Sequence, residues 1–372
     1  MCPQGLNWEE GARGGVLPVA ITAFPEAVLY IDVVPLREKS LIAGIRRQAK
    51  RRPGTGHVLK GIGDDCAILR IPAGHDSLVT TDFSLEGVHF RRDWHPPESV
   101  GHRCLARGLS DIAAMGGKPV AAFLSLALPT DLSQAWVDGF LRGLLKLAQK
   151  YGVTLAGGDT AESPDGILAD IIVVGAVPRG KAVLRSGARP GDRIFVSGQL
   201  GGSAAAVVAM DKETEVRHPE WSRSSGEARD LAQSTLKGYP RHFHPDPRLE
   251  LGQVLRKKRL ASAMIDLSDG LSADLNHICE ESGVGADLAS ELIPRARVGK
   301  PAHEVSLELA LHGGEDYELV FTVPPGKRVP ARVGGVTITE IGVIMRSRGI
   351  FLRDEKGRPS PLAAHGWEHF RR

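Results

Sequence analysis

The chain has 372 residues, long enough for two domains, and its 42% hydrophobic, 24% charged and 5% aromatic residues are typical of an ordered globular protein. Lys and Arg (47) exceed Asp and Glu (44) by only three, which argues against a nucleic acid or an anionic membrane surface as the partner. The cysteines, Cys2, Cys66, Cys104 and Cys279, are scattered without metal or disulfide spacing, which favours a reducing, cytoplasmic location.

Residues 1–36 are expected to form an irregular extension. Prolines and acidic residues interrupt its apolar stretch, which argues against a spanning helix, and no basic segment precedes an unbroken apolar run as in a secretory signal. In the first half, Ser133 is a candidate helix cap and Gly152 a candidate helix end. The predicted elements are helices over 36–50, 99–115 and 133–151 and strands over 77–81, 121–128 and 170–177.

The Gly-, Arg- and Pro-rich segment 179–192 is predicted to separate two domains, 37–178 and 179–372. The glycine run at 198–204 is interpreted as the start of a helix, and the polar segment 211–248 as a surface excursion. The second half is predicted to contain strands over 193–197, 263–267, 319–323 and 337–343, a helix beginning at Gly202 and a helix over 271–282. Strands and helices interleave in both halves, so the fold class is α/β (α+β).

Aspartates recur where short apolar runs end in glycine or hydroxyl residues. The four segments are GIGDDCAIL (61–69), TTDFSLEGVHF (80–90), LAGGDTAESP (155–164) and MIDLSDGLSADL (264–275). Loops at strand ends leave carboxylates free, and Asp is a short oxygen ligand that magnesium prefers. For one cluster alone, turn chemistry is the better explanation. Four clusters together favour a site for several magnesium ions.

Two single residues are open to a plainer interpretation. Asp111 lies on a predicted helix and, by spacing alone, pairs equally well with Arg107 on a solvated face. His89 has aromatic and apolar neighbours, and such a histidine is more often packed or on the surface than a ligand. The sequence contains no G-x-x-x-x-G-K-[ST] phosphate loop, and no serine or cysteine triad can be assembled from it.

Taken in order from about residue 37 to the end, these motifs resemble the thiamine-monophosphate kinase family. That family belongs to the ATP-binding superfamily of aminoimidazole ribonucleotide synthetase, selenophosphate synthetase and a hydrogenase maturation factor. The resemblance also rests on four further segments: LARGLSDIAAMGGKP (105–119), VLRSGARPGD (183–192), ALHGGEDYELVFTV (310–323) and GWEHF (366–370). Single motifs are moderately specific, whereas eight in the right order are strongly specific.

The resemblance implies a magnesium-dependent enzyme that transfers the γ-phosphoryl group of ATP, its co-substrate, in line to thiamine monophosphate, forming thiamine diphosphate. It implies a homodimer formed through the sheet of an N-terminal α/β domain, with ATP bound between this domain and a C-terminal α/β domain. The implied magnesium ligands are Asp65, Thr80, Thr81, Asp82, Asp111, Asp159, Asp266 and Asp269, of which Asp65, Asp82 and Asp111 are the implied catalytic residues. The implied ATP contacts are Gly158, Asp159, Arg185 and Ser268, and those to thiamine monophosphate are His89, Glu315 and Trp367.

Other functions stay open at this point. Aminoimidazole ribonucleotide synthetase shares the ATP architecture and differs mainly in the pocket for its second substrate. A non-catalytic, ATP-binding relative is disfavoured by the complete set of aspartates. Selenophosphate synthesis would need a reactive cysteine near a glycine-rich N-terminus, and the maturation factor a C-terminal cysteine, and the chain has neither context. The roles of Asp64 and Asp316, which lie inside motifs, also stay open.

Overall fold

The structure, a computed structural model, describes residues 38–50, 56–62, 66–217, 238–299 and 301–366. The predicted extension 1–36 lies outside these ranges. The first helix, α1 (Glu38–Lys50), begins just after it and contributes Leu41 to the main hydrophobic core. Within the described ranges, no helix combines the length and the apolar character needed to span a bilayer.

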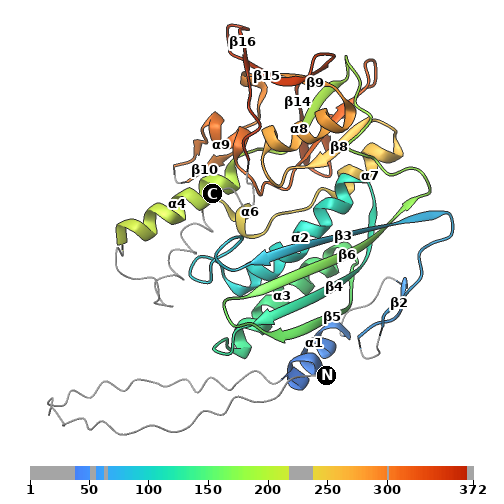
Figure 1. Ribbon diagram of the computed structural model, residues 1–372, viewed down its shortest axis with the longest axis vertical. Helices are drawn as coiled ribbons and strands as arrows, with labels where there is room; N and C mark the ends of the chain where they lie inside the picture. The colour runs from blue at the N-terminus through green and yellow to red at the C-terminus, as the bar shows by residue number, and fades with distance from the viewer. Residues whose placement is uncertain (1–37, 51–55, 63–65, 218–237, 300, 367–372) are drawn as a thin grey trace, which may run out of the picture. The chain divides into compact units, whose positions relative to one another are not determined.

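A four-stranded mixed sheet, in the order β3-β6-β4-β5, forms the centre of the first half. Its strands are β3 (His75–Leu85), β4 (Lys118–Leu128), β5 (Thr154–Glu162) and β6 (Leu168–Pro178). Helices α2 (Pro97–Ala114) and α3 (Gln134–Tyr151) pack together on one face of this sheet (Figure 1). Leu105, Phe140 and Ile171 are fully buried between these helices and the sheet. The opposite face leaves Val79 and Phe83 of β3 exposed, and the short strands β1 (Val58–Lys60) and β2 (Ile68–Leu69) form a separate hairpin.

The second half is built around a larger sheet, whose strand order is β16-β15-β9-β14-β7-β12-β8, with β13 beside β14. Its strands are β7 (Arg193–Ser197), β8 (Ala263–Asp266), β9 (Gly285–Ala289), β12 (Leu319–Val323), β13 (Arg332–Val333), β14 (Val336–Met345), β15 (Gly349–Arg353) and β16 (Pro359–Pro361). The helices are α4 (Gly202–Arg217), α6 (Pro240–Phe243), α7 (Leu249–Lys257), α8 (Leu271–Ser282), α9 (Leu307–His312) and the 3₁₀ helix η1 (Ser290–Leu292). A second core cluster, which includes Ile194, Leu275 and Val320, packs against this sheet, and β10 (Arg297–Val298) pairs with β11 (His303–Glu304) outside it.

The predicted helices and strands all occur, and only their ends are shifted. The expected caps of α3 are confirmed: the Ser133 hydroxyl accepts a hydrogen bond from the Trp136 amide at 3.3 Å, and Gly152 has the left-handed φ of 67°. The glycine run at 198–204 does lead into a helix, α4. The mixed α/β fold with two sheets is therefore confirmed.

Two predictions about aspartate-bearing loops are wrong. The strand predicted over 77–81 continues through Asp82 to Leu85 as β3, and most of 155–164 belongs to β5. Thr and Phe favour strands. In β3 the polar side chains of Thr80 and Asp82 lie on the face toward α2, where they contact Asp111 and Arg107. Gly157 and Gly158 resemble a turn in the sequence, but here they permit close pairing of β5 with β4.

The prediction that 211–248 forms a surface excursion is also wrong over the part that the structure describes. Helix α4 continues to Arg217, residues 218–237 lie outside the described ranges, and in α6 both His242 and Phe243 are buried. The Ser99 hydroxyl donates to the Phe243 carbonyl at 3.0 Å, and Arg103 donates to the His242 carbonyl. The segment can be polar and buried because its polar groups are hydrogen-bonded to neighbouring residues.

Candidate active site

A group of carboxylates lies where β3, α2 and β8 meet. Asp82 is in β3, Asp111 is in α2, and Asp266 is the last residue of β8. The Thr80 hydroxyl, on the same face of β3 as Asp82, donates a hydrogen bond to Asp111. The carboxyl groups of Asp82 and Asp111 also lie close enough together for each to influence the pKa of the other. The structure therefore brings together four of the predicted magnesium ligands: Thr80, Asp82, Asp111 and Asp266.

The electrostatics of this group favour a bound cation. Burial and then the charge of Asp111 raise the pKa of Asp82 to about 7. Burial also raises the pKa of Asp111, although its hydrogen bond from Thr80 opposes the shift, and burial followed by Asp111 raises the pKa of Asp266 well above its usual range. Carboxyls whose charge is disfavoured by burial and by neighbouring carboxyls become carboxylates when a divalent cation neutralises them. The donor chemistry thus fits a hard cation such as magnesium.

The described residues do not by themselves provide a complete set of metal ligands. Among the residues that the structure describes, no three His, Cys, Asp or Glu side chains are arranged to hold a metal ion. Asp64 and Asp65, in the motif GIGDDCAIL, lie outside the described residues. Thr80, Asp82, Asp111 and Asp266 therefore form a cluster of oxygen donors that would need further ligands to hold a metal ion.

Two other predicted ligands belong to the opposite face of the sheet. The side chains of adjacent strand residues alternate between faces, and the Thr81 hydroxyl donates to Asp170 at 2.7 Å, away from Asp82. Ser125 pairs with both Asp170 and Asp159 across the sheet, so Asp159 lies on this face too, where its exposed carboxylate accepts from the next amide at 2.8 Å. The predicted ligand set is therefore divided between the two faces.

The loop after β8 carries Ser268 and Asp269 and is held by one buried side chain. A single carboxylate oxygen of Asp274, in α8, accepts hydrogen bonds from the amides of Ser268, Asp269 and Gly270, each at 3.1 Å. Burial and then the charge of Asp269 raise the pKa of Asp274 to about 7. The backbone of this loop is therefore fixed directly after β8, as a ligand-binding loop requires.

The remaining predicted ATP contacts, Gly158 and Arg185, have different surroundings. Gly158 has φ of 146°, and a Cβ there would lie 1.8 Å from the Leu124 carbonyl oxygen, so strand pairing alone requires glycine at this position. Arg185 lies within electrostatic range of Asp111, because its positive charge opposes the rise that burial causes in the pKa of Asp111. Arg185 is therefore placed to meet an anion beside these carboxylates.

Two arginines of α2 connect Asp82 to Glu315, a residue with the unusual φ of 65° in the loop before β12. Arg103 Nη2 lies 2.6 Å from the Glu315 carboxylate, and Arg107 Nη1 lies 3.7 Å from the same oxygen. Arg107 Nε is 3.8 Å from Asp82 Oδ1. Burial alone would raise the pKa of Glu315, but the two guanidinium groups lower it, so Glu315 is charged. The ion pairs described for Arg107 therefore involve Asp82 and Glu315, rather than Asp111 as its spacing suggested.

A pocket beside these arginines contains His89. The residues that line it are Ser84, His89, Phe90, Val100, Arg103 and Arg107. The His89 ring accepts a hydrogen bond from the Leu85 amide at its Nδ1, at 3.0 Å. The structure thus places the predicted substrate residues His89 and Glu315 near the same two arginines, whereas Trp367 lies outside the described residues.

Arg103 and Arg107 were not predicted as site residues. The sequence does contain a signal for them, since residues 103, 107 and 111 are four apart and so share one face of a helix. That signal was interpreted only as a possible pair between Arg107 and Asp111. Without the fold, nothing shows that this face is covered by β3 and by the loop carrying Glu315.

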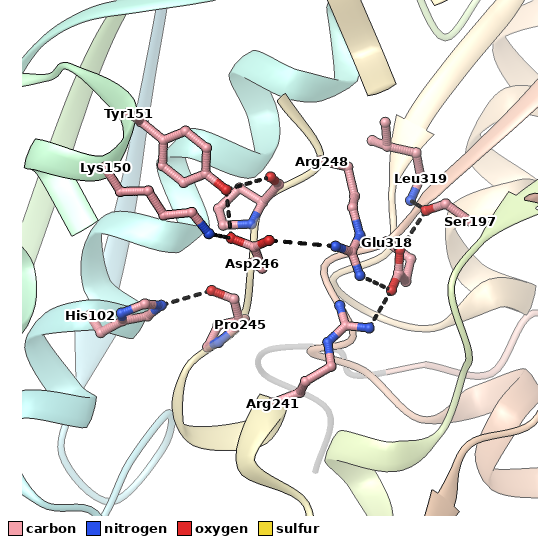
Figure 2. A network of polar contacts seen from close by, with 11 residues as sticks. His102, Lys150, Tyr151, Ser197, Arg241, Pro245, Asp246, Arg248, Glu318 and Leu319 are labelled. Atoms are coloured by element: carbon pink, nitrogen blue, oxygen red, sulfur yellow. Dashed lines mark hydrogen bonds and ion pairs between the residues drawn. The ribbon is translucent and has the colours of Figure 1, made fainter. Parts of the chain in front are cut away.

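The loop that carries Glu315 is fixed by buried acidic residues on its C-terminal side. Asp316 accepts hydrogen bonds from the amides of Gly201, at 2.7 Å, and Ser203, at 3.4 Å, at the start of α4, and burial raises its pKa to about 7. Glu318, fully buried, accepts from Arg248, Arg241 and Ser197 (Figure 2). The same close-up shows Asp246 paired with Lys150 and Tyr151 of α3, so residues 241–248 connect α3 to β12.

Comparisons with known proteins match most of the chain. The family domains described as AIR synthase related protein, N-terminal domain and C-terminal domain, match residues 63–177 and 189–355. The thiamine-monophosphate kinase of Escherichia coli (strain K12) is 40% identical over 320 residues, which cover 83% of this chain and 91% of that protein. The crystal structure of thiamine-monophosphate kinase from Stenotrophomonas maltophilia K279a is 33% identical with a TM-score of 0.69, covering 88% of this chain and 99% of that one. A solved structure described as AaThiL complexed with AMPPCP and TMP is 32% identical with a TM-score of 0.64, covering 90% and 99%.

Proposed function

The chain belongs to the thiamine-monophosphate kinase family, and we propose that magnesium held by Asp82, Asp111 and Asp266 supports its ATP-dependent phosphorylation of thiamine monophosphate to thiamine diphosphate. The observation that carries this proposal is the group of mutually repelling carboxyls at the meeting point of β3, α2 and β8. A phosphoryl-transfer enzyme needs such a group, because its two substrates are both polyanions.

The electrostatic requirement can be estimated. Each pair of like unit charges 4 Å apart costs about 4 kcal/mol at an effective dielectric constant of about 20. Bound magnesium would neutralise this repulsion and align the acceptor oxygen with the γ-phosphorus. Arg185 adds a fork of donors for the polyphosphate. The acceptor phosphate is mostly deprotonated near pH 7, so the reaction needs no general base.

The other residues that the family resemblance implies complete the proposed site. Additional magnesium ligands would come from Asp65 and Asp269, whereas Asp159 would serve a further magnesium ion on the opposite face of the sheet. Thr81 would contribute through its main chain, because its hydroxyl is bonded to Asp170. Gly158, Asp159, Arg185 and Ser268 would contact ATP. His89, Glu315 and Trp367 would contact thiamine monophosphate, and the first two of these lie near Arg103 and Arg107.

The domain limits and the oligomeric state are also proposals. We place the domain boundary in 179–192, because β6 ends at Pro178 in one sheet and β7 begins at Arg193 in the other. A homodimer formed through the open face of the first sheet is supported by Val79 and Phe83, whose side chains are 67% and 54% exposed. The cytoplasmic location expected from the scattered cysteines stays a prediction.

The first test is an assay of the purified full-length chain with ATP, magnesium and thiamine monophosphate. Thiamine diphosphate and ADP are read directly by chromatography, with and without EDTA. We expect both products in equal amounts, and neither after chelation. Formation of ADP and inorganic phosphate without thiamine diphosphate would contradict the proposal that thiamine monophosphate is the acceptor. The next substrate to test would then be formylglycinamidine ribonucleotide. Full activity in EDTA would contradict the magnesium proposal.

A further inference from the structure

We propose that Arg103 and Arg107 form an anion site that binds the phosphate of thiamine monophosphate. This inference rests on the proposed function and specifies how the acceptor is held. Both arginines are on the face of α2 that looks toward β3, one helical turn apart, and both line the pocket that contains His89. The ligand is a phosphate monoester, since thiamine monophosphate is the acceptor of the proposed function and His89, an implied contact to it, lines the same pocket.

The Arg103 guanidinium group is buried and that of Arg107 is partly buried, and both bring positive charge into the pocket. Arg103 is 4% exposed, and the Arg107 side chain is 17% exposed. Glu315 is the anion that contacts both of them, at 2.6 Å and 3.7 Å. The other nearby carboxylate is Asp82, 3.8 Å from Arg107 Nε, and its charge would be shared with the proposed magnesium. Glu315 alone cannot then neutralise two guanidinium groups, so they keep a net positive charge, which favours a phosphate dianion.

Arg107 also has hydrogen-bonding capacity that the described residues do not use. Its Nε is buried and has no hydrogen-bond partner in that part of the chain, and its contact with Glu315 at 3.7 Å is too long for a hydrogen bond. A buried donor without a partner is costly. A phosphate oxygen in the pocket would satisfy this Nε, and the planar guanidinium can bind two phosphate oxygens side by side.

The location of this anion site suits the acceptor rather than ATP. Arg107 Nε lies 3.8 Å from Asp82, so a phosphate bound to Arg107 would lie directly beside the carboxylates proposed to hold magnesium. His89 and Ser84 belong to the same pocket, and the His89 Nδ1 accepts from the Leu85 amide, which places the ring proton on Nε2 in the neutral form. Arg185 provides the separate positive charge near Asp111. The acceptor phosphate would thus be bound by Arg103 and Arg107, and the polyphosphate of ATP by Arg185.

The test compares the binding of thiamine monophosphate and of thiamine, which lacks the phosphate, to Arg107→Met, Arg107→Lys and the wild type. Isothermal titration calorimetry without ATP measures both affinities on the same full-length preparation. In Arg107→Met we expect about a 10- to 100-fold loss of affinity for thiamine monophosphate, the usual effect of losing charge-assisted hydrogen bonds, and little change for thiamine. Arg107→Lys should lose less, since it keeps the charge without the fork.

The control is Arg142→Met, which removes an exposed arginine paired with Glu98 at 2.5 Å on the neighbouring helix and should behave as wild type. The ratio of the two affinities does not depend on the folded fraction, and Arg107→Lys keeps the buried charge if Arg107→Met folds poorly. An unchanged ratio, or a raised KM for ATP with an unchanged KM for thiamine monophosphate, would overturn the inference. If the wild type binds neither thiamine compound, the proposed function itself is contradicted.

Discussion

Arg248 and Glu318 form a doubly hydrogen-bonded ion pair, in which Nε and Nη2 of the arginine each lie 2.6 Å from a carboxylate oxygen. Glu318 is fully buried, and it also accepts from Arg241 Nη1 at 2.7 Å and from the Ser197 hydroxyl at 2.5 Å (Figure 2). Burial alone would raise the pKa of Glu318, but Arg248 and Arg241 lower it. Because Glu318 follows Glu315 by three residues, this pair fixes the backbone that presents Glu315 to the α2 arginines.

Replacing Arg248 by Met should destabilise the protein by about 3–5 kcal/mol, because it removes one partner of a buried ion pair and leaves the other under-compensated. Urea denaturation followed by circular dichroism measures this difference. Arg142→Met, which removes an exposed ion pair, should change the free energy of unfolding by about 1 kcal/mol at most. Equal effects of the two substitutions would mean that the Arg248–Glu318 pair does not hold residues 241–248 against β12.

Replacing Asp82 by Asn should lower kcat by at least about 100-fold while the protein stays folded. Asp82 is proposed to hold magnesium, and its raised pKa shows that its charge is unfavourable in the fold without a cation. Loss of this charge should therefore cost activity without costing stability. The assay is thiamine diphosphate formation at saturating ATP and magnesium, and the matched control is Asp131→Asn, at an exposed position. Wild-type activity in the Asp82 variant would exclude it from the site.

His89→Ala and Glu315→Ala should each raise the KM for thiamine monophosphate more than the KM for ATP. His89 lines the pocket with Arg103 and Arg107, and Glu315 orients both guanidinium groups. Steady-state kinetics with each substrate varied in turn gives the two constants. If the KM for ATP rises more, the two substrates occupy the opposite pockets to those proposed here.

The elements predicted well are those whose signals are local. Helix α3 was expected over 133–151 and spans Gln134–Tyr151. Its ends could be predicted because Ser133 and Gly152, the residues that cap it, are directly adjacent to it in the sequence. Strand β7 and helix α8 occur over the predicted residues for the same reason, since apolar periodicity and flanking glycines are short-range features. The recurring aspartate segments predicted that Asp82 and Asp266 share a site for magnesium ions, whereas the inclusion of Asp111 depended on the family resemblance, because its spacing alone fitted a pair with Arg107 equally well.

The features that were missed depend on contacts between distant segments. The burial of His242 and Phe243 is accompanied by hydrogen bonds from Ser99 and Arg103 to their carbonyls, which polarity along the sequence cannot reveal. The division of Thr81 and Asp159 from Asp82 follows from the alternation of side chains along strands. The predicted strand over 77–81 ended before Asp82, and no strand was predicted around Asp159. The two α2 arginines gain their role only because the Glu315 loop lies beside them.

A buried pair of histidines should make the fold sensitive to acid. His95 and His242 are 3% and 1% exposed, and their Nε2 atoms lie 3.0 Å apart. One ring must donate and the other accept in this contact, so at least one of them is neutral. Burial and then the positive charge of Arg103 lower the pKa of both rings well below 6.5, although Glu315 raises that of His95. His242 also contacts the Ser203 hydroxyl through Nδ1, at 2.8 Å.

The sign of the effect follows from proton counting. Both rings have a lower pKa in the folded state than in the unfolded chain, so below about pH 6.5 the unfolded state binds up to two more protons. The stabilisation is fully present above that pH and is lost as the pH falls, by about 1.4 kcal/mol per pH unit for each ring. Urea denaturation between about pH 5 and pH 8 should show this slope in the wild type, and His242→Gln should reduce it by one proton. An identical slope in the variant would mean that His242 is already protonated in the fold.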